Sequence, residues 1–264
     1  MDFATYPEPT EGLVIERSGN RLTVTLDRPA KLNTLTPAMG KALMSLVPVI
    51  NEDDDVRVVV LQGTGDRAFS AGSDVSVLDQ YGSNWQLRNR VDYARQIWAI
   101  RKPVISKIRG YCIGGGLELA LMSDIRVASS SARFGAGEIK LGWHGGAGNT
   151  QLLPRVIPPG KAMSMLFTGD LIDADEAYRC GLVDELVDEA DIDAFVDDLA
   201  SRIAASAPIA TQLAKHLVRV SQSTSLEVGL AYENDTFAYC FTTQDSAEGR
   251  SAFAEKRPPN FRGR

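Results

Sequence analysis

The chain has 264 residues, of which 44% are hydrophobic and 23% are charged, and this length suits one large core or a core with an appendage. Its formal net charge of −6 gives no basic surface for nucleic acid, and no apolar run approaches the ~20 residues that span a bilayer. We therefore expect no nucleic-acid partner and no membrane partner.

Cysteine and histidine are too scattered to predict a disulfide framework or a metal site. The two histidines, His144 and His216, are too far apart in the sequence for a local metal motif. An odd number of widely spaced cysteines favours reduced thiols. They are Cys112, Cys180 and Cys240. The first residues, MDFATYPEPTEG, contain neither an apolar signal core nor an Arg-rich transit pattern, so we expect a cytoplasmic protein.

The first two-thirds of the chain alternate between strand and helix patterns. Residues 13–18 and 21–26 alternate apolar and polar side chains around Gly19-Asn20, which predicts a β-hairpin. Thr36 and Pro37 predict a helix start, with the threonine as N-cap. The strands and helices that follow are typical of an α/β protein. The expected strands lie at 56–62, 103–108 and 125–128, and the expected helices lie near 85–100 and 114–123.

From about residue 190 onward the pattern is helical. Pro208 stands where a new helix would begin, since proline suits the first helical position. The expected helices cover 190–206, 208–221, 225–240 and 244–256.

The segment from Lys102 to Asp124, KPVISKIRGYCIGGGLELALMSD, holds the most informative pattern. The helix after the glycines at 114–116 is apolar on all sides, so we expect it to be buried. Glu118 lies inside it, and a buried carboxylate is costly unless it is paired. The glycines would let a ligand approach the free N–H groups at the helix start. A purely structural role for Glu118 at the helix dipole stays open.

A second loop has the same small-residue character. Residues 56–62 predict a buried strand, and GTGDRAFSAGSDV follows at 63–75. Loops at the ends of parallel strands carry ligands in α/β proteins. The small residues at 70–73 would leave backbone N–H groups accessible. Two such loops could each donate one N–H to a single carbonyl oxygen, a geometry that suits a thioester enolate.

The two loops resemble the signature segments of the crotonase (enoyl-CoA hydratase/isomerase) superfamily. These segments are AFSAGSDV at 68–75 and GYCIGGGLELALMSDIRVAS at 110–129. Four further segments resemble the family in the same order: LDRPAKLNTLT at 26–36, FGAGEIKLG at 134–142, FTGDLIDADEAYRCGLVDELV at 167–187 and SAFAEKRPPNF at 251–261. The resemblance implies a crotonase-like spiral of β-β-α units over 1–200. It also implies a helical C-terminal trimerisation region over 201–264, in a homotrimer or a dimer of trimers.

The resemblance also assigns residues to the site. One oxyanion N–H would come from Ser73, after the Ala-Gly pair, and the other from Gly115 in the glycine triplet. The two glutamates of the family's hydratases match Glu118 and Glu138. The same loops supply further positions at the substrate: Ala71, Asp74 and Gly114.

Three basic residues are candidates for contacts with coenzyme A. Arg28 and Lys31 could meet its phosphates, although a solvated surface charge is the ordinary role of such residues. Lys256, in AEKRPP, resembles the family's C-terminal coenzyme A contact, which often reaches a neighbouring subunit. An exposed lysine without a function is the alternative.

After Glu138 the sequence departs from the family pattern LGxxPGAGGTQRL and reads LGWHGGAGNTQLL at 141–153. Trp143 and His144 add bulk and a titratable ring, and we expect them to shape a pocket for a branched, cyclic or polar acyl group. The alternative is a tryptophan in the core and a structural histidine in the loop. The substituted positions are Gly145 for proline, Asn149 for glycine and Leu152 for arginine.

We therefore predict an enoyl-CoA hydratase that adds water syn to a 2,3-enoyl-CoA, or catalyses the reverse dehydration, with no metal and no redox cofactor. Coenzyme A enters as part of the acyl-CoA substrate. Within the family the alternatives are double-bond isomerisation by Glu138 alone and another acyl-CoA lyase reaction. Outside it, a G-x-G-x-x-A match at 63–68 suggests a nucleotide-dependent oxidoreductase, and the scaffold could instead serve as a non-catalytic binding protein.

Overall fold

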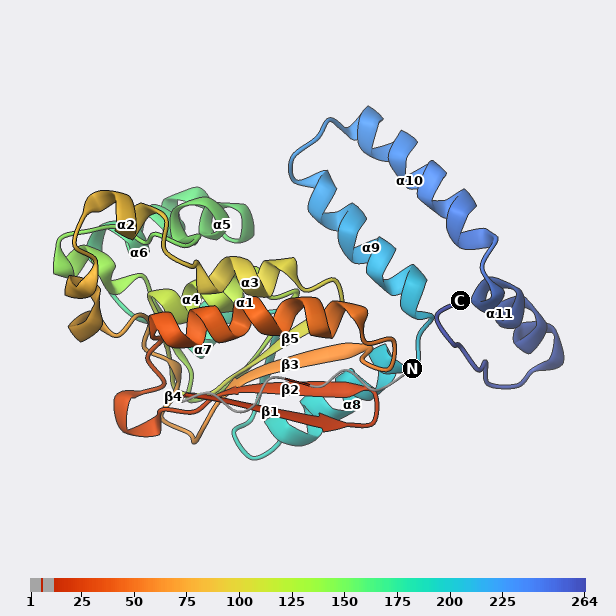
Figure 1. Ribbon diagram of the computed structural model, residues 1–264, viewed down its shortest axis with the longest axis horizontal. Helices are drawn as coiled ribbons and strands as arrows, with labels where there is room; N and C mark the ends of the chain where they lie inside the picture. Colours follow the sequence, from red (N-terminus) through yellow and green to blue (C-terminus); the bar gives the residue numbers. More distant parts are fainter. Residues whose placement is uncertain (1–5, 7–11) are drawn as a thin grey trace.

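The computed structural model describes Tyr6 and residues 12–264, and its strands form two sheets (Figure 1). The larger sheet has six strands in the order β1-β2-β3-β5-β7-β10, and the smaller has four in the order β4-β6-β8-β9. The strands are β1 (Leu13–Ser18), β2 (Arg21–Leu26), β3 (Val58–Gly63), β4 (Ala68–Ser70), β5 (Val104–Ile108), β6 (Tyr111–Ile113), β7 (Ile125–Ser129), β8 (Arg133–Gly135), β9 (Ile172–Asp173) and β10 (Glu185–Val187).

Helices separate the strands and then make up the C-terminal part of the chain. Three are short 3₁₀ helices, η1 (Pro29–Lys31), η2 (Val75–Gln80) and η3 (Gly137–Leu141). The α-helices are α1 (Pro37–Glu52), α2 (Asn84–Arg88), α3 (Tyr93–Ala99), α4 (Gly115–Met122), α5 (Asn149–Val156), α6 (Pro159–Thr168), α7 (Ala174–Arg179), α8 (Ile192–Ala204), α9 (Pro208–Ser221), α10 (Leu226–Phe241) and α11 (Gln244–Glu255).

The N-terminal hairpin and the first helix confirm the sequence predictions. β1 and β2 pair antiparallel from Leu13↔Leu26 to Ser18↔Arg21, so Gly19 and Asn20 form the turn. At the start of α1, the Thr36 side chain accepts a hydrogen bond from the N–H of Met39. That bond satisfies one of the helix's free donors, which explains why the helix begins there.

From β3 onward the chain repeats a strand–strand–helix unit. β3, β5 and β7 lie parallel in the larger sheet, while β4, β6 and β8 lie parallel in the smaller one. Each turn of the chain therefore adds one strand to each sheet before the next helical segment. This repetition is the spiral of β-β-α units that the resemblance implies, and it places the ends of successive strands side by side.

The central strands of the larger sheet, β3, β5 and β7, are buried on both faces. In β3, Val59 and Leu61 face the core that lies under α1, α3 and α4, whereas Val58 and Val60 pack against α8. This alternation follows from the two-residue period of a strand. Figure 1 shows α8 on the opposite side of the sheet from α1, α3 and α4. A sheet covered in this way explains the continuous apolar run of β3 in the sequence.

One predicted helix is interrupted. The stretch near 85–100 contains two helices, α2 and α3, with Asn89–Asp92 between them. The Asp92 carboxylate accepts hydrogen bonds from the N–H groups of Ala94 and Arg95, so it caps a new helix start. Aspartate prefers this position over a helix interior, and the apolar pattern alone does not reveal the break.

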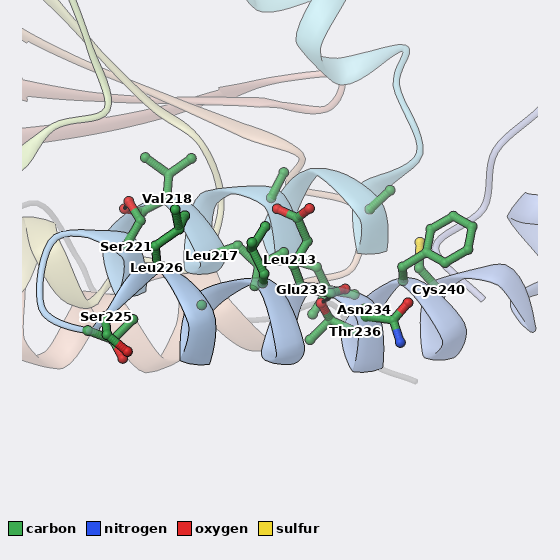
Figure 2. Close-up of a pocket in the computed structure, with 16 residues that line it drawn as sticks. Leu213, Leu217, Val218, Ser221, Ser225, Leu226, Glu233, Asn234, Thr236 and Cys240 are labelled. Carbon is green, nitrogen blue, oxygen red and sulfur yellow. Dashed lines mark hydrogen bonds between the residues drawn. The ribbon is translucent and has the colours of Figure 1, made fainter.

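The last three helices lie beside the spiral (Figure 1). α9 and α10 run alongside each other and enclose a mostly apolar groove of about 940 Å³ (Figure 2). α8 crosses the predicted boundary between residues 200 and 201, and the boundary itself stays a prediction. None of the helices in the described part of the chain has the length and apolar character that a membrane span needs.

Candidate active site

The glycine triplet allows α4 to begin against two neighbouring elements. Gly114 has φ +55°, in the left-handed region that favours glycine. A Cβ on Gly115 would lie 2.2 Å from the hydroxyl oxygen of Tyr93, and a Cβ on Gly116 would lie 2.1 Å from the carbonyl oxygen of Ser70. Because any side chain at these two positions would clash, the glycines fix the close packing of α4 on β4 and α3.

Glu118 is buried in the first turn of α4, with 2% of its surface exposed. Its Oε1 accepts hydrogen bonds from the N–H groups of Ala147 at 2.7 Å and Asn149 at 3.4 Å. Burial raises the pKa of Glu118 to about 7, and the nearby carboxylate of Glu138 acts in the same direction. The Ala147 hydrogen bond opposes this shift because it favours the charged form. A carboxyl with this pKa can both accept and release a proton near neutral pH.

Glu138 faces the same place from η3, which follows β8. Its Oε1 accepts a hydrogen bond of 2.9 Å from the side-chain amide of Asn149. Its Oε2 is buried and has no hydrogen-bond partner among the residues that the structure describes. A Cβ on Gly114 would lie 3.5 Å from Cδ of Glu138, so the carboxylate lies directly on the start of α4. The structure thus brings Glu118 and Glu138 together around Asn149.

The two predicted oxyanion donors also lie close together. The N–H of Leu35 donates to the carbonyl oxygen of Gly72, and the N–H of Asp74 donates to the carbonyl oxygen of Leu35. Successive backbone groups of an extended chain point to opposite sides, so the N–H of Ser73 points away from Leu35. A Cβ on Gly72 would lie 2.9 Å from the backbone nitrogen of Gly115, which places the two segments in direct contact.

Both backbone N–H groups are available to a ligand. Within the described part of the chain, neither the N–H of Ser73 nor that of Gly115 donates a hydrogen bond. Two converging free N–H groups can stabilise a negative oxygen that develops during a reaction. The structure therefore places these two backbone N–H groups, unpaired among the described residues, in the part of the fold that also holds the two carboxylates.

Comparison with known proteins identifies the family. The profile of the enoyl-CoA hydratase/isomerase family matches residues 16–264. The chain belongs to the enoyl-CoA hydratase/isomerase family. It is 35% identical to a crotonyl-CoA hydratase of Syntrophomonas wolfei, in an alignment that covers 95% of this chain and 98% of that protein. It is 36% identical to an (E)-benzylidenesuccinyl-CoA hydratase of Thauera aromatica, over 95% of this chain and 99% of the relative.

A solved structure confirms the fold. The crystal structure of an enoyl-CoA hydratase from Bacillus anthracis superposes with a TM-score of 0.89 at 33% identity, covering 96% of this chain and all of that chain. The prediction of a crotonase-like α/β spiral with a helical C-terminal region is therefore confirmed. The protein is an enzyme of the enoyl-CoA hydratase/isomerase family.

The oxidoreductase alternative fails on local structure. A dinucleotide fingerprint needs a helix directly after its glycines, so that the helix N-terminus meets the pyrophosphate. Here Gly63 ends β3 and Ala68 begins β4, so the motif connects two strands. A strand cannot offer the converging N–H groups of a helix start.

Arg28 and Asp74, two of the predicted substrate contacts, pair with each other. Nη2 of Arg28 lies 2.9 Å from Oδ2 of Asp74, and Nη1 donates to the carbonyl oxygen of Thr34. Hydrogen bonding from Ser76 and from Arg28 lowers the pKa of Asp74. The pair ties the Ser73 loop to η1, and Lys31 is exposed at the end of η1.

The remaining predicted residues lie at the edges of the site or away from it. Trp143 is 42% exposed, so it is not a core residue of the single chain. His144 is also exposed, and its Nδ1 lies 2.8 Å from the carbonyl oxygen of Gly145. The N–H of Ala71 is already bonded to the carbonyl oxygen of Leu32. Lys256 is exposed at the end of α11. Figure 1 shows α11 on the far side of α9 from α5.

The sequence did not predict the contacts that two residues, Asn149 and Tyr93, make in the site. Asn149 was noted as a departure from the family pattern, but its contacts with both glutamates were not expected. The hydroxyl groups of Tyr93 and Ser73 share a hydrogen bond of 2.7 Å, which places Tyr93 beside the oxyanion pair. Burial raises the pKa of Tyr93, and the carboxyl of Glu118 adds to this effect. No local motif marks Tyr93, because its role depends on the packing of α3 against α4.

Proposed function

We propose that this protein is an enoyl-CoA hydratase, which adds water to a 2,3-enoyl-CoA or removes it in the reverse direction. The observation that carries the proposal is the convergence of Glu118 and Glu138 around Asn149, beside the free N–H groups of Ser73 and Gly115. The two relatives named above are both hydratases of acyl-CoA thioesters.

The thioester oxygen would accept hydrogen bonds from Ser73 and Gly115. As water attacks C3, electron density moves through the double bond onto that oxygen, and each donor typically supplies about 3 kcal/mol of stabilisation. Glu118 takes a proton from the attacking water while the oxygen of that water bonds to C3. Glu138 delivers a proton to C2, so the product gains one water in total. Loss of the proton from Glu118 and reprotonation of Glu138 by exchange with solvent then restore the starting state. Hydration leaves the net oxidation state unchanged, and so we expect no redox cofactor. We expect no metal because the N–H groups of Ser73 and Gly115 would stabilise the charge on the thioester oxygen that a Lewis-acid metal could otherwise stabilise.

The acyl group belongs to the same proposal. The relatives named for crotonyl-CoA and for (E)-benzylidenesuccinyl-CoA are almost equally similar to this chain, so overall identity does not select a substrate. Trp143 and His144 follow Glu138 by a few residues, and the backbone N–H of Trp143 donates to the carbonyl oxygen of Glu138 at 3.4 Å. We assign their exposed rings to the mouth of a pocket for a branched, cyclic or polar acyl group.

Assembly and location complete the proposal. We propose a homotrimer or a dimer of trimers in the cytoplasm, with coenzyme A bound as part of the substrate. The apolar groove between α9 and α10 and the exposed aromatic side chains of the last helices support self-association. Lys256 would then meet coenzyme A across a subunit boundary, while Arg28 and Lys31 would contact it from η1.

A direct assay tests the activity. The purified protein is mixed with crotonyl-CoA and with branched and aromatic enoyl-CoA esters. Ultraviolet absorbance follows loss of the conjugated double bond, and mass spectrometry tests for addition of one water. We expect a 3-hydroxyacyl-CoA product from at least one ester. Movement of the double bond without a mass change would instead identify an isomerase, and the absence of any turnover would support a binding protein.

A further inference from the structure

Asn149 joins the two carboxylates of the site through different atoms. It is the first residue of α5 and is fully buried. Its backbone N–H donates to Oε1 of Glu118 at 3.4 Å, and its side-chain Nδ2 donates to Oε1 of Glu138 at 2.9 Å. Nδ2 also lies 3.3 Å from the carbonyl oxygen of Gly114. Since both neighbours of this atom are acceptors, the NH₂ group and not the carbonyl oxygen of the amide must face them.

This bond makes the two oxygens of Glu138 different. Oε1 accepts the amide hydrogen bond, so a proton carried by Glu138 sits on Oε2. Oε2 of Glu138 and Oδ1 of Asn149 are both buried, and neither has a hydrogen-bond partner among the described residues. Burying unpaired polar atoms is costly, and two of them on one bonded pair indicate a surface built to meet a ligand.

Gly145 provides the space for the Asn149 side chain. A Cβ on Gly145 would lie 2.8 Å from Cβ of Asn149 and 3.1 Å from its Nδ2. The family pattern has proline at 145 and glycine at 149, so a Cβ at 145 usually meets no side chain at 149. The two departures in LGWHGGAGNTQLL therefore form one change, in which the side chain lost at 145 makes room for the amide gained at 149.

We propose that Asn149 is a positioning residue that fixes Oε2 of Glu138 as the oxygen that carries the proton to C2. In this proposal the absence of a side chain at Gly145 leaves the room that the Asn149 side chain needs. The proposal rests on the proposed hydratase function. Without the amide, either oxygen of Glu138 can carry the proton and the carboxylate can rotate, so fewer bound complexes are ready to react.

Kinetics of Asn149→Ala test the positioning role. Glu138 becomes charged as its proton leaves for C2, and a hydrogen bond to a charged group is typically worth a factor of about 10 to 100, so kcat for hydration should fall by that factor. KM should stay within about threefold, because the amide acts on Glu138 and not on coenzyme A. Thr150→Ala, at the next position of α5, is the matched control and should keep both constants. A kcat of Asn149→Ala equal to that of the parent enzyme would overturn the role.

Hydrogen exchange isolates the proton transfer from the addition of water. Butyryl-CoA has no double bond to hydrate, so deuterium uptake at its C2 in D₂O reports the C2 proton transfer alone. Asn149→Ala should slow this exchange by about the same factor as kcat, whereas Thr150→Ala should not slow it. Undiminished exchange in Asn149→Ala would place the amide in another step and contradict the inference.

Melting temperatures test the link to Gly145. Gly145→Ala should lower the melting temperature by several degrees, and Asn149→Gly should remove at least half of that loss in the double variant. Some loss should remain because the added Cβ would also lie 3.0 Å from Oε1 of Glu118. If Gly145→Ala lowered the melting temperature equally in the parent and in the Asn149→Gly variant, the steric link would be overturned. Because this readout does not use turnover, it stands even if the parent enzyme hydrates none of the esters and the proposed function fails.

Discussion

The raised pKa of Glu118 results from the position of this side chain in the fold. Glutamate normally titrates near 4.5, but burial in α4 raises the pKa of this side chain to about 7. The shift means that the charged form is disfavoured in the folded protein, partly because Glu138 lies close by. Hydrogen bonds from the backbone of Ala147 and Asn149 limit the effect. The burial that raises this pKa therefore also costs stability when the carboxyl is charged.

Removing either carboxylate should abolish most of the activity. We expect Glu118→Gln and Glu138→Gln each to reduce hydration by at least ~100-fold, the usual scale for a general acid or base. Steady-state assays measure this loss, and circular dichroism should show an unchanged fold because glutamine is isosteric. Full hydration by Glu118→Gln would contradict the hydratase assignment. Retained isomerisation in that variant would instead favour a reaction carried by Glu138 alone.

Glu118→Gln should also change how the free energy of unfolding depends on pH. The folded-state pKa of Glu118 is raised, so the associated stability is fully present below about pH 4.5 and is lost as pH rises through about 7. The shift corresponds to about 3 kcal/mol. We expect Glu118→Gln to be more stable than the parent above pH 7, with a flatter profile between pH 4.5 and 7. Denaturant unfolding at several pH values measures this difference.

A control variant separates burial from net charge in that experiment. Glu16 is exposed on β1, so Glu16→Gln removes one negative charge without relieving a buried carboxylate. It should leave the pH profile of stability close to that of the parent. If the two variants behaved alike, the effect could not be assigned to the burial of Glu118.

His144 should determine part of the acyl preference. Its ring is exposed and follows Glu138 by a few residues in the chain. A site that hydrogen-bonds a polar group discriminates strongly against an analogue that lacks it. We expect His144→Ala to lower kcat/KM for polar acyl groups by ~10-fold or more and to change it little for crotonyl-CoA. A panel of enoyl-CoA esters measures these ratios. An unchanged order of preference would mean that the ring has no part in selection.

At the scale of elements, Asp124 connects α9 to the sheet. Its carboxylate accepts a hydrogen bond of 2.7 Å from the N–H of Val104 in β5. It also lies 2.5 Å from Nζ of Lys215 and 3.0 Å from Nη2 of Arg219, both on α9. Arg219 stacks on Trp98, with 4.0 Å between the guanidinium carbon and the ring centre. Burial lowers the pKa of Lys215 to about 8, whereas Asp124 acts to keep it charged.

Loss of this carboxylate should destabilise the protein. Asp124→Asn leaves two mostly buried cations without their counter-charge, which typically costs about 3 kcal/mol or more. We expect a lower unfolding free energy and faster proteolysis in the segment that links α8 to α9. The control is Asp198→Asn, which breaks an exposed pair with Arg202 and should change stability by less than ~1 kcal/mol. Equal effects of the two substitutions would contradict an anchoring role for Asp124.

At the scale of the whole molecule, the last three helices leave apolar surface uncovered. In Figure 2, Leu213 and Leu217 of α9 lie between that helix and α10. The large apolar side chains exposed on α9, α10 and α11 are Val218, Leu226, Val228, Leu230, Tyr232, Phe237, Tyr239, Phe241 and Phe253. A concentration of exposed apolar side chains on three successive helices favours an interface between proteins. The spiral core, in contrast, buries most of its apolar side chains within the single chain.

This surface should hold the assembly together. We expect light scattering at micromolar concentration to give the mass of a trimer or of a dimer of trimers. The double substitution Leu230→Asp and Phe237→Asp should shift the mass toward the monomer, because it places charges in an apolar contact. Met44→Asp, at an exposed apolar position on α1, is the control and should leave the mass unchanged. A monomeric parent protein would refute the prediction.

Local sequence determined several elements of this protein correctly. The hairpin register followed from the two-residue period and the Gly19-Asn20 turn, and α1 followed from its Thr36-Pro37 start. Pro208 marked the first residue of α9. The break between α2 and α3 was missed, because the capping bonds of Asp92 competed with an apolar pattern that suggested one helix. Signals of this kind are predictable when the residues that carry them are neighbours in the chain.

The sequence by itself also determined the family, since the two signature loops have distinctive glycine patterns, and it predicted two glutamates for the site. The tertiary structure decided how these residues meet. Asn149 lies 11 residues after Glu138 and 31 residues after Glu118, and it reaches both because α4 packs against α5 while the Glu138 carboxylate lies on the start of α4. Tyr93 meets Ser73 across the contact of α3 with α4. Such contacts depend on side chains that fit in three dimensions, so no periodicity or short motif encodes them.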